Sequence, residues 1–136
     1  MKKKNILKIL LFIYLILLSW LVLFKLGFSI SDMRRVRDVN FIPFYYDNII
    51  EGDLFWLEPI FNILIFIPFG ILLKKISCGI KINQAFLIFL VVSLFFEIMQ
   101  YIMSIGASDI TDVITNVLGG VIGFLVADIF TKRKNN

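Results

Sequence analysis

Residues 85–105, AFLIFLVVSLFFEIMQYIMSI, form an apolar run of 21 residues in which Glu97 is the only charged side chain. A helix needs about 20 predominantly apolar residues to cross the hydrocarbon core of a bilayer. This run is therefore long enough to span a membrane, with Glu97 and Gln100 inside the span. Three further apolar runs occupy Ile6–Phe24, Pro59–Leu73 and Val113–Phe130, and the second of them is marginal in length. The sequence predicts an all-α membrane protein with four transmembrane helices.

The overall composition leads to the same class of protein. Of the 136 residues 60% are hydrophobic, and the mean hydropathy is +0.92, whereas soluble domains are about 45–50% apolar. A chain this short cannot bury the excess in a core, which disfavours a soluble enzyme and excludes a disordered protein. The chain has no His and one Cys, which excludes His-dependent triads and His/Cys zinc sites. With no internal repeat, we expect a single domain over residues 1–136.

Basic residues predict the orientation of the helices. Four spans place both termini and the turn between the second and third runs on one side. That side carries nine cations, or ten with Lys8, whereas the other side carries four. The positive-inside rule therefore predicts cytoplasmic N and C termini and one longer outer loop, about Lys25–Glu58. The nine cations are Lys2, Lys3, Lys4, Lys74, Lys75, Lys81, Lys132, Arg133 and Lys134, and the four are Lys25, Arg34, Arg35 and Arg37.

Eight polar residues from four segments fall in the predicted outer half of the bilayer. Polar groups in a membrane are costly, so each is a functional hypothesis. Three interpretations are open: a hydrogen-bonded network that orients the helices, a ligand-binding pocket, or a catalytic site with Glu97 or Asp112 as the base. Glu97, Asp109 and Asp112 could hold a divalent cation through oxygen ligands, but nothing in the sequence requires one and no cofactor is expected. The eight residues are Arg37, Asn40, Asn62, Glu97, Gln100, Asp109, Asp112 and Asn116.

Small residues recur at four-residue intervals in the last run, at Gly119, Gly123 and Ala127. This spacing places them on one face of a helix and permits close approach of a second helix. The partner is either another helix of the same chain or a second copy of the chain, so a homo-oligomer is an open alternative.

Four motifs follow one another along the chain. They are Arg37-Asp38-Val39-Asn40-Phe41-Ile42-Pro43-Phe44, then Asn62-Ile63-Leu64-Ile65-Phe66-Ile67-Pro68-Phe69-Gly70, then Glu97 with Gln100, and finally Asp109 through Asp112, Asn116, Gly119, Gly120 and Gly123. In this order they resemble the VanZ-like family, and the resemblance covers about residues 34–127. The chain departs from the family at one place, since many members carry an Arg directly after the glycine that precedes the aspartate block. Here Gly106 is followed by Ala107 and Ser108, so we expect Arg37 to take the greater role.

The resemblance implies a multi-pass protein of the bacterial cell membrane that acts at the outer leaflet and contributes to low-level resistance to the glycopeptide teicoplanin. The partners expected are the lipid bilayer and a lipid-linked cell-wall precursor or lipoglycopeptide, without nucleic acid. Two alternatives are a membrane-embedded enzyme acting on a lipid phosphate or cell-wall lipid precursor, and a structural subunit of a larger membrane complex. A binding role is favoured over an enzyme because the chain lacks a His nucleophile and a Gly-rich phosphate loop.

Overall fold

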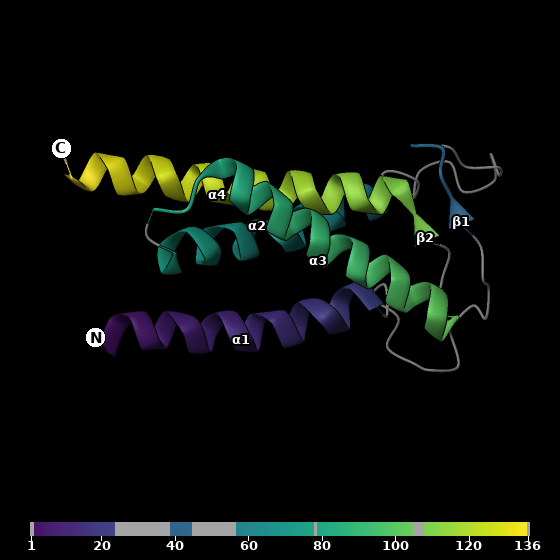
Figure 1. Cartoon of the computed structure of the whole chain (residues 1–136), viewed down its shortest axis with the longest axis horizontal. Coiled ribbons are helices and arrows are strands. Elements are labelled where there is room, and N and C mark those ends of the chain that lie inside the picture. The colour runs from purple at the N-terminus through teal and green to yellow at the C-terminus, as the bar shows by residue number, and fades with distance from the viewer. Residues whose placement is uncertain (1, 24–38, 45–56, 78, 105–107, 136) are drawn as a thin grey trace.

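The described part of the chain forms a bundle of helices that run along its long axis, one of them obliquely (Figure 1). A computed structural model describes residues 2–23, 39–44, 57–77, 79–104 and 108–135. The start of α1 and the end of α4 lie at one end of the bundle, and two short strands lie at the other end (Figure 1). The elements are α1 (Lys2–Leu23), β1 (Val39–Asn40), α2 (Leu57–Ile76), α3 (Ile82–Met103), β2 (Ser108–Asp109) and α4 (Ile110–Asn135).

The described part of the chain contains four helices that are long and apolar enough to cross a membrane, as predicted. The second span is 20 residues long, which is longer than its apolar run, because the helix takes in Leu57 and Glu58 at its start and Lys74–Ile76 at its end. Charged residues interrupt an apolar run without interrupting the backbone hydrogen bonds of a helix. The helix also continues through Pro68.

Glycines allow α4 to pack closely against α2. A Cβ on Gly123 would lie 2.8 Å from the carbonyl carbon of Ile67, and a Cβ on Gly119 would lie 2.9 Å from the carbonyl carbon of Ile63. The neighbouring Gly120 faces α3 instead, where a Cβ would lie 2.6 Å from the ring of Phe89. Adjacent glycines on α4 therefore face two different helices. Ala127 is also buried.

Aromatic rings fill the space between α2 and α3. The Phe66 ring lies edge-on to the rings of Phe69 and Phe96, with 6.1 Å and 6.4 Å between ring centroids. The rings of Phe69 and Phe89 are also edge-on, with 5.3 Å between their centroids. Leu18 of α1 is fully buried against this cluster. Because lipid is as apolar as these side chains, the packing geometry rather than exclusion of water selects this arrangement.

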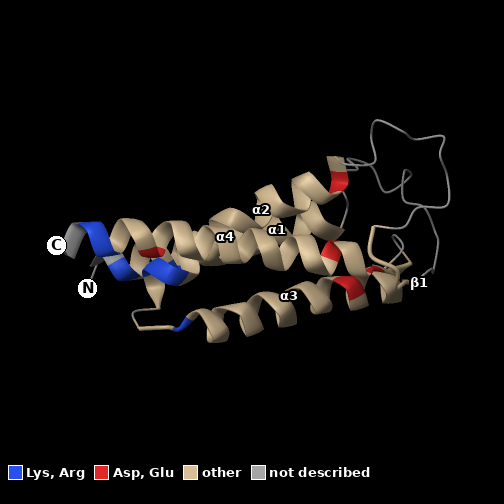
Figure 2. Ribbon diagram, turned by 90° about the horizontal axis from the view of Figure 1, so that it is seen from above, with Lys and Arg blue, Asp and Glu red and all other residues tan. Residues whose placement is uncertain are grey.

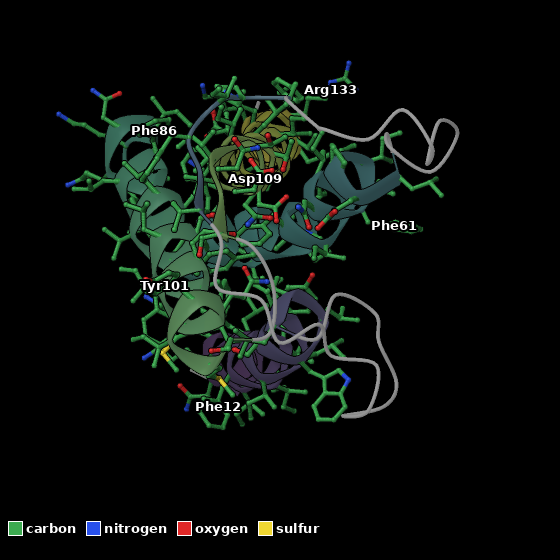
Figure 3. All side chains as sticks on the ribbon, turned by 90° about the vertical axis from the view of Figure 1, so that its right-hand side faces the viewer. Phe12, Phe61, Phe86, Tyr101, Asp109 and Arg133 are labelled. Atoms are coloured by element: carbon green, nitrogen blue, oxygen red, sulfur yellow. The ribbon has the colours of Figure 1, made fainter. Side chains whose placement is uncertain are left out.

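Large apolar side chains also cover the outside of the bundle. Phe12, Phe61, Phe86 and Tyr101 point away from its centre (Figure 3), and each is more than 40% exposed. A surface of this kind is an aggregation hazard in water but is the normal exterior of a protein in a bilayer.

Charges are divided between the two ends of the bundle. The described Lys and Arg residues lie at the end that carries the start of α1 and the end of α4, whereas most Asp and Glu residues lie toward the other end (Figure 2). Asp128 is the acidic residue among the cations. Its Oδ1 lies 2.6 Å from Lys74 Nζ, and its Oδ2 lies 2.9 Å from Lys132 Nζ.

Candidate functional site

A two-residue parallel strand pair brings the first and last motifs together. Val39 lies beside Ser108, and Asn40 lies beside Asp109. The Asn40 Nδ2 group donates to Asp109 Oδ2 at 3.2 Å, and the Asn40 Oδ1 atom accepts the N–H of Ile42 at 3.0 Å. Asn40 therefore fixes its own turn and ties that turn to Asp109. This pair cannot be predicted from the sequence, because two residues are too few to show the alternation that marks a strand.

Asp109 connects three segments of the chain. Its Oδ1 atom accepts the N–H of Thr111 at 2.7 Å, which is the N-cap interaction that begins α4. Its own N–H donates to Glu97 Oε2 of α3 at 2.9 Å. Figure 3 shows Asp109 at the start of α4, with α3 and α2 on either side. Through these contacts and the bond to Asn40, Asp109 joins β1, α3 and α4.

Two further hydrogen bonds hold the segment 39–44 and the start of α4. The N–H of Phe44 donates to the Thr111 hydroxyl oxygen at 2.9 Å. Ser108 Oγ donates to the backbone carbonyl oxygen of Glu97 at 2.7 Å. Neither Ser108 nor Thr111 was singled out from the sequence. Thr111 gives no local signal for its role, because its partner Phe44 is 67 positions away in the chain.

Amide side chains form two further contacts on α4. Asn62 Nδ2 of α2 donates to Asp112 Oδ1 at 2.8 Å. One turn further along α4, Asn116 Nδ2 donates to Ser93 Oγ of α3 at 3.0 Å. Asn116 and Ser93 are fully buried, and Asn116 Oδ1 has no hydrogen-bond partner among the residues that the structure describes. Ser93 could have been found from the sequence, because it lies four residues before Glu97 on the same helix face.

Gln100 bonds to the backbone of α1 rather than to another polar residue of the predicted cluster. Its Nε2 group donates at 2.9 Å to the carbonyl oxygen of Val22, near the end of α1. The last carbonyl groups of a helix have no partner within the helix, so this bond satisfies one of them and fastens α1 to α3. Gln100 is fully buried.

Seven of the eight residues predicted for the cluster lie in the described part of the chain, and they form separate contacts rather than one ring. Arg37, the eighth, lies outside the described residues, as do Cys78 and part of the outer loop. The seven residues also differ in how far they are exposed to the surroundings. Glu97, Asp109 and Asp112 are buried, whereas Asn40 and Asn62 are partly exposed.

The described carboxylates do not converge on one point. Among the described residues, no group of three or more His, Cys, Asp or Glu side chains could hold a metal ion. Both oxygens of Asp109 accept hydrogen bonds from protein groups, from Thr111 and from Asn40. Asp112 accepts from Asn62, and Glu97 accepts from the backbone of Asp109. The carboxylates therefore orient amide and backbone groups, and the amides of Asn40 and Asn62 are more exposed than the carboxylates that accept from them.

Comparisons with known proteins agree on one family. The VanZ/LLP1 family model matches residues 11–131, which include all or most of each of the four helices. Over 128 residues the chain is 44% identical to Protein VanZ of Enterococcus faecium, an alignment that covers 93% of this chain and 76% of the relative. No solved structure matches the chain. By this match and its four apolar helices, the chain belongs to the VanZ/LLP1 family of multi-pass membrane proteins.

Proposed function

We propose that this chain is a VanZ-type protein of the bacterial cell membrane that contributes to low-level teicoplanin resistance by binding a lipid-linked or lipophilic ligand at the outer leaflet. The observation that carries the proposal is the set of buried carboxylates, Glu97, Asp109 and Asp112, at the end of the bundle away from the described cations. Ionisable residues at membrane depth are expensive and mark functional sites by default. The similarity to Protein VanZ supports the resistance role.

The proposal includes an orientation with both termini in the cytoplasm. It is supported by the gathering of the described Lys and Arg residues at the end that carries the start of α1 and the end of α4 (Figure 2). Under this orientation the pair of Asn40 and Asp109 lies at the outer surface. C-terminal fusions test it: a fluorescent protein should fold and emit, and alkaline phosphatase should stay inactive. The reverse pattern would place the carboxylates at the inner leaflet and remove the basis for outer-leaflet binding.

Within the site, the two partly exposed amides, Asn40 and Asn62, are the groups that meet the ligand in this proposal. Each is held by a carboxylate behind it, since Asn40 donates to Asp109 and Asn62 donates to Asp112. Amides both donate and accept hydrogen bonds, which suits the peptide and sugar groups of a cell-wall precursor. Arg37, from the matching family motif, stays a prediction as the group that pairs with an anionic part of the ligand.

Antibiotic susceptibility tests the function. A sensitive Gram-positive host would express the wild-type chain, Asp112→Asn or Asp128→Asn at equal membrane levels. Asp112→Asn removes the charge but keeps an oxygen that can accept from Asn62. Asp128→Asn makes the same atomic change on the same helix, 16 residues or about 24 Å away, among the cations.

Protection against teicoplanin but not vancomycin is expected for the wild type and for Asp128→Asn, and it should be lost in Asp112→Asn. A well-expressed wild type that gives no protection would refute the resistance role. Equal loss in both variants would show that the effect does not depend on the proposed site.

The buried carboxylates also support an alternative, a membrane-embedded enzyme in which Glu97 or Asp112 is the base for a reaction on a lipid phosphate or cell-wall lipid precursor. Incubation of the purified protein with labelled polyprenyl phosphates distinguishes the two. A product that disappears in Asp112→Asn would favour the enzyme, and unchanged substrate would favour binding.

A structural subunit is the third alternative. Because α2 covers Gly119 and Gly123, a complex or homodimer would have to use the lipid-facing surface. Crosslinking in membranes would reveal a partner on that surface.

A further inference from the structure

The segment 39–44 presents apolar side chains at the end of the bundle, next to the polar groups of the site. Phe41 is 78% exposed and Ile42 is 57% exposed. These two residues are more exposed than most of the apolar residues that face outward from the helices. We call Phe41 and Ile42 the apolar tip.

The tip is held in place by hydrogen bonds on both sides. Before it, Asn40 pairs with Asp109 and also accepts the N–H of Ile42. After it, the N–H of Phe44 donates to Thr111, and Phe44 has a φ of 56°, a left-handed conformation that is uncommon outside glycine. A backbone strained in this way persists only when the surrounding contacts fix it. The fold therefore projects Phe41 and Ile42 from a fixed position.

The apolar surface at the same end of the bundle as the tip (Figure 1) indicates what contacts the tip. Tyr101, Ile102 and Met103, at the end of α3, are 43%, 59% and 47% exposed and continue the apolar exterior of the bundle. At 1.5 Å per residue the 22 residues of α3 rise about 33 Å, close to the hydrocarbon thickness of about 30 Å. The end of α3 therefore lies at the depth where lipid chains meet headgroups, and β1, with the segment 39–44, lies at the same end of the bundle (Figure 1).

We propose that the segment 39–44 is an interfacial wedge that inserts Phe41 and Ile42 among the lipid chains of the leaflet at this end of the bundle. The wedge anchors Asn40, and with it Asp109, at headgroup depth, where the polar part of a membrane lipid is in reach. The partner is thus the bilayer itself. The inference does not depend on which ligand the site binds or on which leaflet faces outward.

Spin-label accessibility in vesicles tests the insertion. In a Cys78→Ser background, single cysteines at Phe41, Ile42, Val91 and Arg133 carry a nitroxide, and the protein is reconstituted in phosphatidylethanolamine–phosphatidylglycerol vesicles. Val91 is exposed midway along α3, and Arg133 is exposed among the cations at the far end. Collisions with oxygen report lipid exposure, and collisions with a water-soluble nickel chelate report water exposure.

At positions 41 and 42 the ratio of oxygen to nickel collisions should be close to that at Val91 and well above that at Arg133. A ratio equal to that at Arg133 would place the tip in water and overturn the proposal. Low collision rates with both reagents would show that protein covers the tip, which would also overturn it. Because both positions are exposed, the labels should not disturb the fold, and circular dichroism of each labelled protein checks this. The result is independent of antibiotic protection, so the wedge and the proposed function can fail separately.

Discussion

The bond between Asn40 and Asp109 permits a residue exchange that should break and then restore one contact. In Asp109→Asn, the atom that accepts the N–H of Thr111 is kept, and Asn is a good N-cap. The other atom becomes an NH2 group that faces the NH2 group of Asn40. Asn40 cannot rotate its amide to compensate, because its Oδ1 already accepts the N–H of Ile42. The substitution therefore removes one hydrogen bond and leaves α4 capped.

The size of the effect follows from the geometry. A hydrogen bond to a charged group contributes about 1.5–3 kcal/mol, and the 3.2 Å length and partial burial of this one favour the lower end. A loss of about 1.5 kcal/mol corresponds to about tenfold more frequent opening of the segment 39–44. Asn40→Asp should be worse, because two carboxylates at this distance repel by about 5 kcal/mol at an effective dielectric constant of about 20.

The double variant, Asn40→Asp with Asp109→Asn, should restore the contact. The carboxylate introduced at position 40 accepts both the N–H of Ile42 and the side-chain amide introduced at position 109. The original pattern of hydrogen bonds therefore returns with the donor and the acceptor exchanged.

Hydrogen exchange measures this opening directly. In detergent micelles or nanodiscs, the amide protons of Ile42 and Phe44 should exchange about tenfold faster in Asp109→Asn, faster still in Asn40→Asp, and close to the wild-type rate in the double variant. Asp128→Asn is the matched control and should leave both rates unchanged. If the double variant exchanges as fast as the worse single variant, the bond between Asn40 and Asp109 does not hold the segment, and the reasoning is refuted.

Two further predictions concern the packing of the helices, and both are measured as the free energy of unfolding in SDS titrations. Gly123→Ala places a Cβ 2.8 Å from the carbonyl carbon of Ile67, whereas carbon atoms in contact normally lie about 3.5–4.0 Å apart. The overpacking should cost about 1–3 kcal/mol, which outweighs a gain of up to about 1 kcal/mol in helix propensity, so the variant should be less stable. Val126→Ile adds one carbon on the exposed side of α4 and should have no effect, so equal values for the two variants would contradict the close α2–α4 contact. Gln100→Leu removes the bond to Val22 and should cost about 0.6–1.7 kcal/mol, whereas no loss would show that α1 does not depend on it.

The sequence predicted the membrane class and the four helices, and it drew attention to the eight polar residues of the candidate site. These properties depend on composition and on the length of each apolar run. Both can be read along the chain without knowing which segments meet in the fold. The family resemblance also follows from motifs that can be read along the chain, and the family match confirms it. The apolar runs did not mark the ends of the helices, because charged residues at the membrane surface end an apolar run without ending the helix. The second helix is the clearest case, with Lys74 and Lys75 inside its last turn.

Only the tertiary structure decided which of the polar residues meet. Glu97 and Gln100 are three residues apart and so share a face of α3, yet Glu97 accepts from Asp109 and Gln100 donates to the backbone of α1. Similarly, Asp112 and Asn116 share a face of α4, yet one accepts from α2 and the other donates to α3. Each outcome depends on how the helices are rotated and how closely they approach. Those quantities are set by packing between segments far apart in the chain, and no local pattern in the sequence records them.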